Sequence, residues 1–355
     1  MSEILASVNN SKISDIYKLV VSMKYIYILT STPKDFYYEQ CLMSVFSLKA
    51  HNPNAQVQIL VDNKTADSFT VENKRDGLKK LGAEIISVEF DDSIKNVERS
   101  RRLKTTIPEH ITGDFLFIDC DTIICDDLSD IEKIDAKFAA VLDGHVPLSE
   151  HKHKEYFVKR EKKLGFSATK NTGKHFNSGV MLYRDCTESK KMFDKWNELW
   201  DFGFTNHHDH HDQPAFNEAS FQTGNLLCEL DGEWNCQISQ GGLQFLKNAK
   251  IIHYFSSEAA GKNYISYYKL ADKSIQQRIK ETGEIPEDIK EMILDPKFQF
   301  TGVHLLNDQR IIEIMQSPLI FTIADIKSKL PFLFKIMDGF CGGLRSFAKK
   351  IKGKK

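Results

Sequence analysis

Two aspartates, Asp119 and Asp121, follow the apolar run FLFI with a single cysteine between them. Because side chains alternate along a β-strand, we expect both carboxylates to lie on the same side of the strand that ends here. Two unpartnered carboxylates repel each other, whereas a divalent cation between them removes the conflict. The pair therefore indicates metal-dependent chemistry, although two acids at the start of a solvated loop would give the same local pattern.

Alternating strands and helices in the first 120 residues must position this pair. Amphipathic stretches at 38–46 and 98–110 predict helices between apolar runs that predict strands. Such alternation is typical of an α/β fold with a mostly parallel central sheet and helices on both faces. Ligands of these sheets bind at the carboxyl ends of the strands, where the aspartates stand. The strands are expected at 24–30, 56–61, 83–90 and 114–120.

The following residues continue the same domain, because no Pro- or Ser-rich linker divides them. An expected helix that ends at Gly203 carries an apolar stripe, which we interpret as core packing and not as a sugar platform. The stripe consists of Met192, Phe193, Trp196, Leu199 and Trp200. Further strands are expected at 137–142, 176–183, 226–230 and 250–255.

The composition describes a folded chain without a membrane span or a disulfide framework. Of its 355 residues, 41% are hydrophobic and 27% are charged, which allows a sizeable core. No apolar run approaches the roughly 20 residues of a transmembrane helix, and residues 1–15 lack the pattern of a secretory signal. Seven cysteines without a Cys-x-x-Cys pair indicate reduced cytoplasmic thiols and no structural zinc site.

The charge is distributed unevenly along the chain. Residues 327–355 hold nine Lys/Arg and one acid, a net charge of +8, so residues 1–326 sum to −1 − 8 = −9. This argues against a nucleic-acid partner and predicts that the tail meets an anionic membrane surface as a basic amphipathic helix. A helix packed on the body with a solvated basic end is the alternative. The apolar positions are Leu330, Leu333, Met337, Phe340, Leu344, Phe347 and Ile351.

Five short motifs follow one another along the chain. They are Arg102-Leu103-Lys104, Asp119-Cys120-Asp121, Phe176-Asn177-Ser178-Gly179-Val180, Asp212-Gln213-Pro214-Ala215-Phe216-Asn217, and Trp234-Asn235 followed by His253-Tyr254. With these motifs in this order, the sequence resembles glycosyltransferase family 8, the GT-A-fold retaining enzymes that include bacterial lipopolysaccharide galactosyl- and glucosyltransferases. The resemblance spans residues 24–255. It departs from the family in one respect: the usual Gly-x-x-Lys-Pro-Trp after the histidine is missing, and Lys262 is the nearest lysine.

The resemblance implies a transferase that moves a hexose from a UDP-sugar to a glycan or glycolipid acceptor, with retention of anomeric configuration. It implies a metal site for Mn²⁺ (or Mg²⁺), because the implied ligands are two carboxylates and an imidazole. The implied metal ligands are Asp119, Asp121 and His253, and the implied catalytic residues are Asp212, Gln213 and Asn177. The implied donor-binding residues are Thr30, Ser31, Arg102, Asp119, Asp121, Asn177, Ser178 and Lys262.

The resemblance also sets the expected division of the chain. We expect a lead-in at 1–23, a GT-A catalytic domain at 24–256, a helical extension at 257–326 and the basic tail at 327–355. The protein is expected to be cytoplasmic and peripheral on the inner face of a membrane, where polysaccharide or lipopolysaccharide is built.

Two other functions stay open at this point. A metal-dependent phosphatase would use Asp119 as a nucleophile, but its Asp-x-Asp-x-Thr/Val pattern meets Ile123 here. A sugar-nucleotide-binding protein without catalysis would explain the missing Gly-x-x-Lys-Pro-Trp. The histidine-rich run 207–212 is interpreted as a polar loop that leads into the helix at Asp212, with a second metal site as the alternative.

Overall fold

The computed structural model describes residues 23–255, 268–297 and 317–352. The chain divides into two compact units between Lys297 and Phe298, and each unit is described by itself. The first unit contains the two sheets. The described residues of the second unit form two helices.

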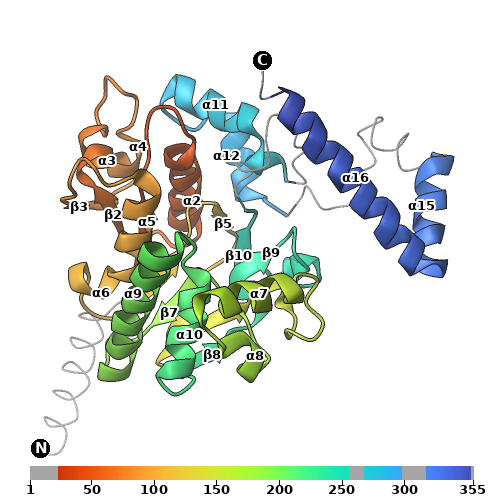
Figure 1. The fold of residues 1–355 in the computed structure, drawn as a ribbon. Helices are drawn as coiled ribbons and strands as arrows, with labels where there is room; N and C mark the ends of the chain where they lie inside the picture. The colour runs from red at the N-terminus through yellow and green to blue at the C-terminus, as the bar shows by residue number, and fades with distance from the viewer. Residues whose placement is uncertain (1–22, 256–267, 298–316, 353–355) are drawn as a thin grey trace, which may run out of the picture. The chain divides into compact units, whose positions relative to one another are not determined.

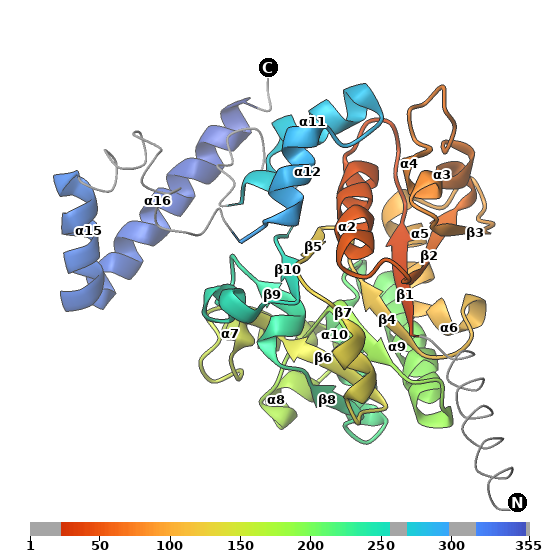
Figure 2. The same cartoon turned by 180° about the vertical axis from the view of Figure 1, so that it is seen from behind.

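Seven strands form the central sheet of the first unit, in the order β3-β2-β1-β4-β7-β6-β8 (Figures 1 and 2). Strand β1 is parallel to β2 and β4, and β2 is parallel to β3, whereas β7 is antiparallel to β4 and β6. The sheet is therefore mostly parallel, as predicted. The strands are β1 Lys24–Leu29, β2 Gln56–Asp62, β3 Glu84–Val88, β4 Phe115–Ile118, β6 Phe138–Leu142, β7 Phe176–Tyr183 and β8 Leu227–Glu229.

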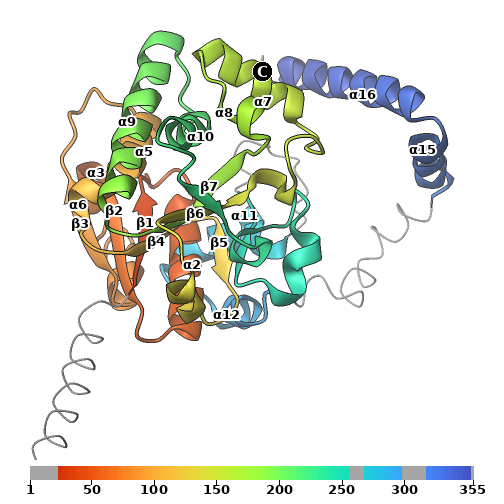
Figure 3. The ribbon, with the colours of Figure 1, turned by 90° about the horizontal axis from the view of Figure 1, so that it is seen from below.

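Helices cover both faces of this sheet, which explains the continuously apolar strands. Figure 3 shows α5, α9 and α10 on one side of the sheet and α2 on the other. Helices α11 and α12 pack against α2. The helices of the first unit are α2 Tyr37–His51, α3 Asn63–Asp67, α4 Gly77–Lys80, α5 Asn96–Thr105, α6 Ile107–His110, α7 Lys154–Leu164, α8 Ala168–Thr172, α9 Thr187–His207, α10 Gln213–Gln222, α11 Lys273–Thr282 and α12 Glu287–Leu294.

Helix α9 packs its aromatic stripe into the main core. All five predicted stripe residues are buried, so their interpretation as core packing is confirmed. The predicted end of the helix at Gly203 is wrong, because the helix continues to His207. Gly203 is buried, and a Cβ there would lie at an ordinary contact distance of 3.5 Å from the Leu164 side chain, so the packing of α9 on α7 does not require a glycine at this position.

A second, three-stranded sheet has the order β5-β10-β9. Strand β5 spans Thr122–Ile124, β9 spans Cys236–Gln237 and β10 spans Ile251–His253. The prediction that Asp119 and Asp121 continue one alternating strand is therefore wrong. Strand β4 ends at Ile118, and the chain crosses to the second sheet before β5 begins. The two aspartates lie in the connection between the sheets.

In the second unit the structure describes α15, Pro318–Lys329, and α16, Pro331–Lys352. The helix expected in the basic tail is thus present, and many of its large apolar side chains are exposed. Among the described helices, none combines the length and the apolar character that crossing a bilayer requires.

Candidate active site

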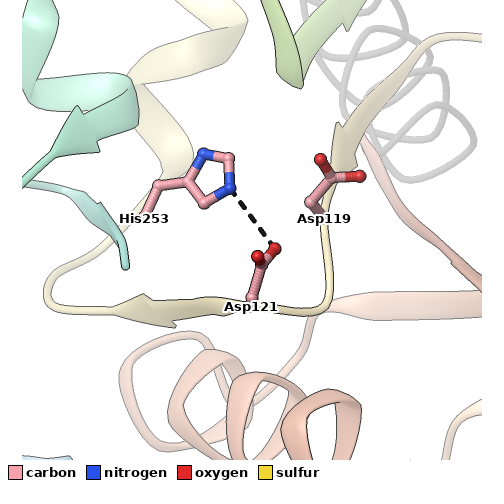
Figure 4. Close-up of side chains that lie close together, drawn as sticks. All are labelled: Asp119, Asp121 and His253. Atoms are coloured by element: carbon pink, nitrogen blue, oxygen red, sulfur yellow. Dashed lines mark ion pairs between the residues drawn. The ribbon is translucent and has the colours of Figure 1, made fainter. Parts of the chain in front are cut away.

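The carboxylates of Asp119 and Asp121 meet the imidazole of His253, which comes from the end of β10 (Figure 4). One ligand atom of each residue lies within 4.8 Å of the others, and His253 Nε2 is 3.3 Å from Asp121 Oδ1. Gly179 makes room for this ring, because a Cβ at residue 179 would lie 2.4 Å from His253 Cε1. The predicted metal ligands are therefore brought together, although 132 positions separate Asp121 from His253 in the sequence.

Two cations from α5 balance the charge of the site. Lys104 Nζ lies 3.2 Å from Asp119 Oδ1 and 3.5 Å from Asp212 Oδ2. Arg101 Nε lies 3.1 Å from Asp212 Oδ1. Asp212 also accepts a hydrogen bond of 3.0 Å from the Ser178 hydroxyl. Its carboxylate is therefore fixed by three partners at the start of α10.

The pKa values follow from this crowding of charges. Burial raises the pKa of Asp119, Asp121 raises it further, and Lys104 opposes both. Burial alone would lower the pKa of His253, but Asp121 and Asp119 raise it above the usual value. Burial disfavours ionised Asp212, yet Arg101 and Lys104 hold its pKa far below the ordinary value. The site thus attracts positive charge around Asp119 and Asp121 and keeps Asp212 ionised.

Two clefts of about 260 and 270 Å³ share Arg101, Asp119 and Asp121. The first, which we call the strand-end cleft, lies at the carboxyl end of β1 and is lined by Thr30, Tyr37, Asn96, Val97, Ser100 and Cys120 among others. The second, which we call the histidine cleft, continues past His253 and is lined by Tyr156, Arg160, Asn177, Ser178, His211 and Gln213 among others. The three shared residues therefore lie at the junction of the two clefts, where one ligand could extend from one cleft into the other.

Most of the predicted site residues line one of these clefts. Thr30 lines the strand-end cleft, and Asn177, Ser178, Asp212 and Gln213 line the histidine cleft. Lys262 lies outside the described residues.

Two predicted donor-binding residues lie elsewhere. Arg102 pairs with Glu98 and Asp201 on the far side of α5, and it lines neither cleft. Ser31 is buried, and its hydroxyl donates to Asp35 at 2.7 Å. Neither side chain therefore lines a cleft, because a helix exposes neighbouring residues on different faces and because Ser31 is held in a buried polar network.

Sequence reasoning missed Arg101 and Lys104 as charged residues of the site. Val97, Ser100, Arg101 and Lys104 stand at i, i+3, i+4 and i+7, the spacing of one helix face. The buried ion pair of 2.7 Å between Arg99 and Asp62 fixes the rotation of α5 so that this face meets the clefts. The spacing was a usable signal, but it did not show which face points inward.

The histidine-rich loop is held by an ion pair. Arg160 of α7 makes two hydrogen bonds to the carboxylate of Asp209, one of them of 2.7 Å, and also contacts His211. Among the residues that the structure describes, Asp119, Asp121 and His253 form the one group of three with metal-binding potential. Arg160 therefore anchors residues 209–211 of this run, whose first residue, His207, ends helix α9.

The comparisons with known proteins assign the family. The model of glycosyl transferase family 8 matches residues 28–263, about two-thirds of the 355 residues. The fold and the site thus define a nucleotide-sugar-dependent glycosyltransferase of GT-A type. The chain belongs to glycosyltransferase family 8.

Several solved glycosyltransferases are similar to this chain, and no curated protein matches it. The galactosyltransferase LgtC, solved with donor and acceptor sugar analogues, is 15% identical with a TM-score of 0.47, over 76% of this chain and 99% of its own. GlyE of Streptococcus pneumoniae TIGR4 is 16% identical with a TM-score of 0.45, over 79% and 65%. Mouse xyloside xylosyltransferase 1 is 12% identical with a TM-score of 0.42, over 66% and 97%.

The residues present fit a divalent cation. Asp119 and Asp121 supply hard oxygen donors, and His253 faces them with Nε2, the nitrogen that does not contact Asn235. Two carboxylates and an imidazole suit Mn²⁺, and carboxylates also accommodate Mg²⁺.

Proposed function

We propose that this glycosyltransferase moves a hexose from a UDP-sugar to a glycan or glycolipid acceptor, with Mn²⁺ (or Mg²⁺) held by Asp119, Asp121 and His253. The observation that carries the proposal is the position of these three groups at the junction of the two clefts. A bound cation there would stabilise the negative charge that develops on the departing diphosphate. The family assignment favours this function over the phosphatase alternative.

The strand-end cleft is the proposed site of the nucleotide. It opens at the carboxyl end of the parallel strand β1, where such sheets bind their ligands. Thr30 and the neighbouring walls from Tyr37 and Val97 would contact the ribose and the base. Arg101 lines both clefts, so we propose it, in place of Arg102, as the arginine that contacts the diphosphate or the sugar. Lys262 remains a proposed diphosphate contact within the matched residues.

The histidine cleft is the proposed site of the hexose and the acceptor. Gln213 presents an amide group, which can both donate to and accept from sugar hydroxyls, and Asn177 lines the same cleft and donates to the Gln213 amide oxygen. Asp212 stays ionised between Arg101 and Lys104, so it would accept from a hydroxyl and hold both cations in place. We propose transfer with retention, in which the leaving phosphate helps to deprotonate the acceptor on the same face of the sugar.

Nucleotide release tests the donor and the metal together. Purified protein would be incubated with a panel of UDP- and GDP-sugars, first with Mn²⁺ and then with EDTA. We expect that one UDP-hexose releases UDP slowly in the presence of Mn²⁺, and that EDTA abolishes this release. Release of phosphate from generic esters without nucleotide specificity would contradict the proposal in favour of a phosphatase.

The Asp121→Asn variant makes this test specific to the site. It should lower Mn²⁺-dependent release by about 100-fold or more, because it removes a charge next to the bound cation. Asp130→Asn is the matched control, since Asp130 is an exposed carboxylate that pairs with Lys133. Normal release by Asp121→Asn would show that the metal assignment is wrong. Donor binding without turnover, even with acceptors supplied, would identify an inactive binder.

We also propose that α16 holds the enzyme on the inner, cytoplasmic face of a membrane. The helix combines exposed apolar residues with the Lys/Arg-rich end of the chain, which fits an anionic lipid surface. All seven cysteines are free, which supports a reducing compartment. We propose the same division of the chain: 24–256 as the catalytic domain, 257–326 as its helical extension and 327–355 as the membrane-binding tail. We also propose that the enzyme acts in the biosynthesis of surface polysaccharide or lipopolysaccharide.

A further inference from the structure

A chain of buried hydrogen bonds runs from His253 away from the two aspartates. His253 Nδ1 lies 2.9 Å from Asn235 Oδ1, Asn235 Nδ2 lies 2.9 Å from Asn177 Oδ1, and Asn177 Nδ2 lies 3.1 Å from Asp143 Oδ2. All four side chains are buried. In such surroundings each polar atom needs its partner, so the direction of every link matters.

Asp143 fixes the direction at the far end of this chain. Burial disfavours its charged form, but hydrogen bonds from His151, Gln213 and Asn177, together with nearby His175, lower the pKa of Asp143 to about 2. An ionised carboxylate can only accept, so Asn177 must present its Nδ2 to Asp143. Asn177 Oδ1 independently accepts from the backbone N–H of Gly179 at 2.9 Å. Both contacts give the Asn177 amide the same orientation.

The orientation of Asn177 sets that of the next two groups. Because Asn177 Oδ1 accepts, Asn235 must donate from Nδ2, and its Oδ1 then faces His253. An amide oxygen can only accept, so His253 carries a hydrogen on Nδ1. As a metal ligand the ring must be neutral, and its lone pair is then on Nε2, the nitrogen that faces Asp121 and Asp119.

We propose that Asp143, through Asn177 and Asn235, is a positioning residue that holds His253 as the Nδ1–H tautomer and so presents Nε2 to the divalent cation. This inference rests on the proposed metal site. Outer partners of this kind orient metal-binding histidines and raise their affinity for the ion. They act on the ligand without touching the metal.

The same carboxylate also orients the sugar side of the site. Gln213 Nε2 donates to Asp143 Oδ2 at 2.8 Å, and Gln213 lines the histidine cleft. On the other side, His151 accepts from the backbone N–H of His153 through Nδ1 at 2.9 Å, so its Nε2–H donates to Asp143 Oδ1 at 3.2 Å. Asp143 therefore couples the metal ligand to an amide that we propose contacts the hexose.

Two variants of Asn235 test the tautomer without relying on turnover. Mn²⁺ affinity would be measured by electron paramagnetic resonance of the free ion, with and without UDP. Asn235→Leu keeps a similar shape but accepts no hydrogen bond, so we expect a loss of about 10- to 100-fold in affinity. The carboxylate introduced by Asn235→Asp still accepts from Nδ1–H, so this variant should bind Mn²⁺ at least as tightly as wild type. Its second oxygen faces Asn177 Oδ1, which is also an acceptor, so the free energy of unfolding should fall.

Nitrogen NMR of the His253 ring gives the direct reading. In Mg²⁺-loaded wild type, Nδ1 should carry the hydrogen and Nε2 should not. Ser189→Ala is the matched control: it removes a buried hydroxyl that donates to the Lys137 carbonyl at 3.0 Å, outside the chain from Asp143 to His253, and should leave Mn²⁺ affinity unchanged.

The outcomes separate this inference from the proposed function. Wild-type affinity in Asn235→Leu, or a His253 Nδ1 without a hydrogen in the Mg²⁺-loaded protein, would overturn the positioning role while Mn²⁺-dependent UDP release kept the proposed function intact. Wild-type protein that binds no Mn²⁺, even with UDP, would overturn both.

Discussion

Helices α9 and α16 carry similar apolar stripes, but one is buried and the other is exposed. The five stripe residues of α9 are 0–9% exposed. The residues Leu333, Met337, Phe340, Leu344 and Phe347 of α16 are 38–68% exposed. Both stripes follow the three-and-four spacing of one helix face.

The difference teaches that spacing predicts a helix and its apolar face but not what covers that face. The α9 stripe includes two tryptophans whose indole N–H groups donate to backbone carbonyls: Trp196 to that of Asp212 at 3.0 Å and Trp200 to that of His210 at 3.5 Å. The α16 stripe is flanked by lysines, which favour an anionic lipid surface as its cover. The α9 stripe thus packs beneath the active site, and we propose that the α16 stripe binds the enzyme to a membrane.

Trp196→Ala should have the largest effect on folding. Trp196 is fully buried between Phe193 and Phe216, and it holds the backbone at Asp212. The cavity should cost about 3–5 kcal/mol of unfolding free energy, measured by denaturant titration. Leu344→Ala in α16 is the counterpart and should change it by less than about 0.5 kcal/mol. Equal losses in the two helices would contradict the contrast between them.

Much of the fold was predictable because its strands are buried on both faces. The runs at 24–30, 56–61 and 176–183 correspond to β1, β2 and β7. The break after Ile118 was not predictable, since Asp119 and Asp121 fit the alternation of a continuing strand as well as a connection between two sheets. Only pairing with β10, distant in sequence, draws Thr122–Ile124 into the second sheet.

Site residues that belong to a sequence motif were predictable, whereas those placed at the site by tertiary contacts were less so. Family motifs pointed to Asp119, Asp121 and His253 together. They pointed to Arg102, but the buried pair of Arg99 with Asp62 turns α5 so that Arg101 faces the clefts. No local pattern marks Asp143, because its importance comes from the amides that other elements bring to it.

Replacing exposed phenylalanines of α16 by acids tests what covers this helix. The double variant with Phe340→Glu and Phe347→Glu should bind phosphatidylglycerol-rich vesicles at least about tenfold more weakly in cosedimentation. The reason is that each phenylalanine that becomes buried in lipid contributes about 1.5–3 kcal/mol to the free energy of binding. UDP release without vesicles should stay unchanged. Leu243→Glu, at another exposed apolar residue, is the matched control and should bind vesicles like wild type. Retained binding by the double variant would show that the stripe does not meet lipid.

Replacing a glycine by alanine in α9 and in α16 should have small effects, on the unfolding free energy in the first case and on vesicle binding in the second. Alanine favours a helix over glycine by up to about 1 kcal/mol. At Gly203 of α9 a Cβ meets Leu164 at an ordinary 3.5 Å, so Gly203→Ala should raise the unfolding free energy by up to about that amount. At Gly342 of α16 a Cβ meets nothing within 4 Å. Gly342→Ala should therefore leave unfolding of the first unit unchanged and tighten vesicle binding up to about fivefold, because a lipid-bound helix is the state that alanine stabilises. If Gly342→Ala instead raised the denaturation midpoint of the first unit as Gly203→Ala does, α16 would be part of the same cooperative fold, and packing on the body would replace lipid as the cover of its stripe.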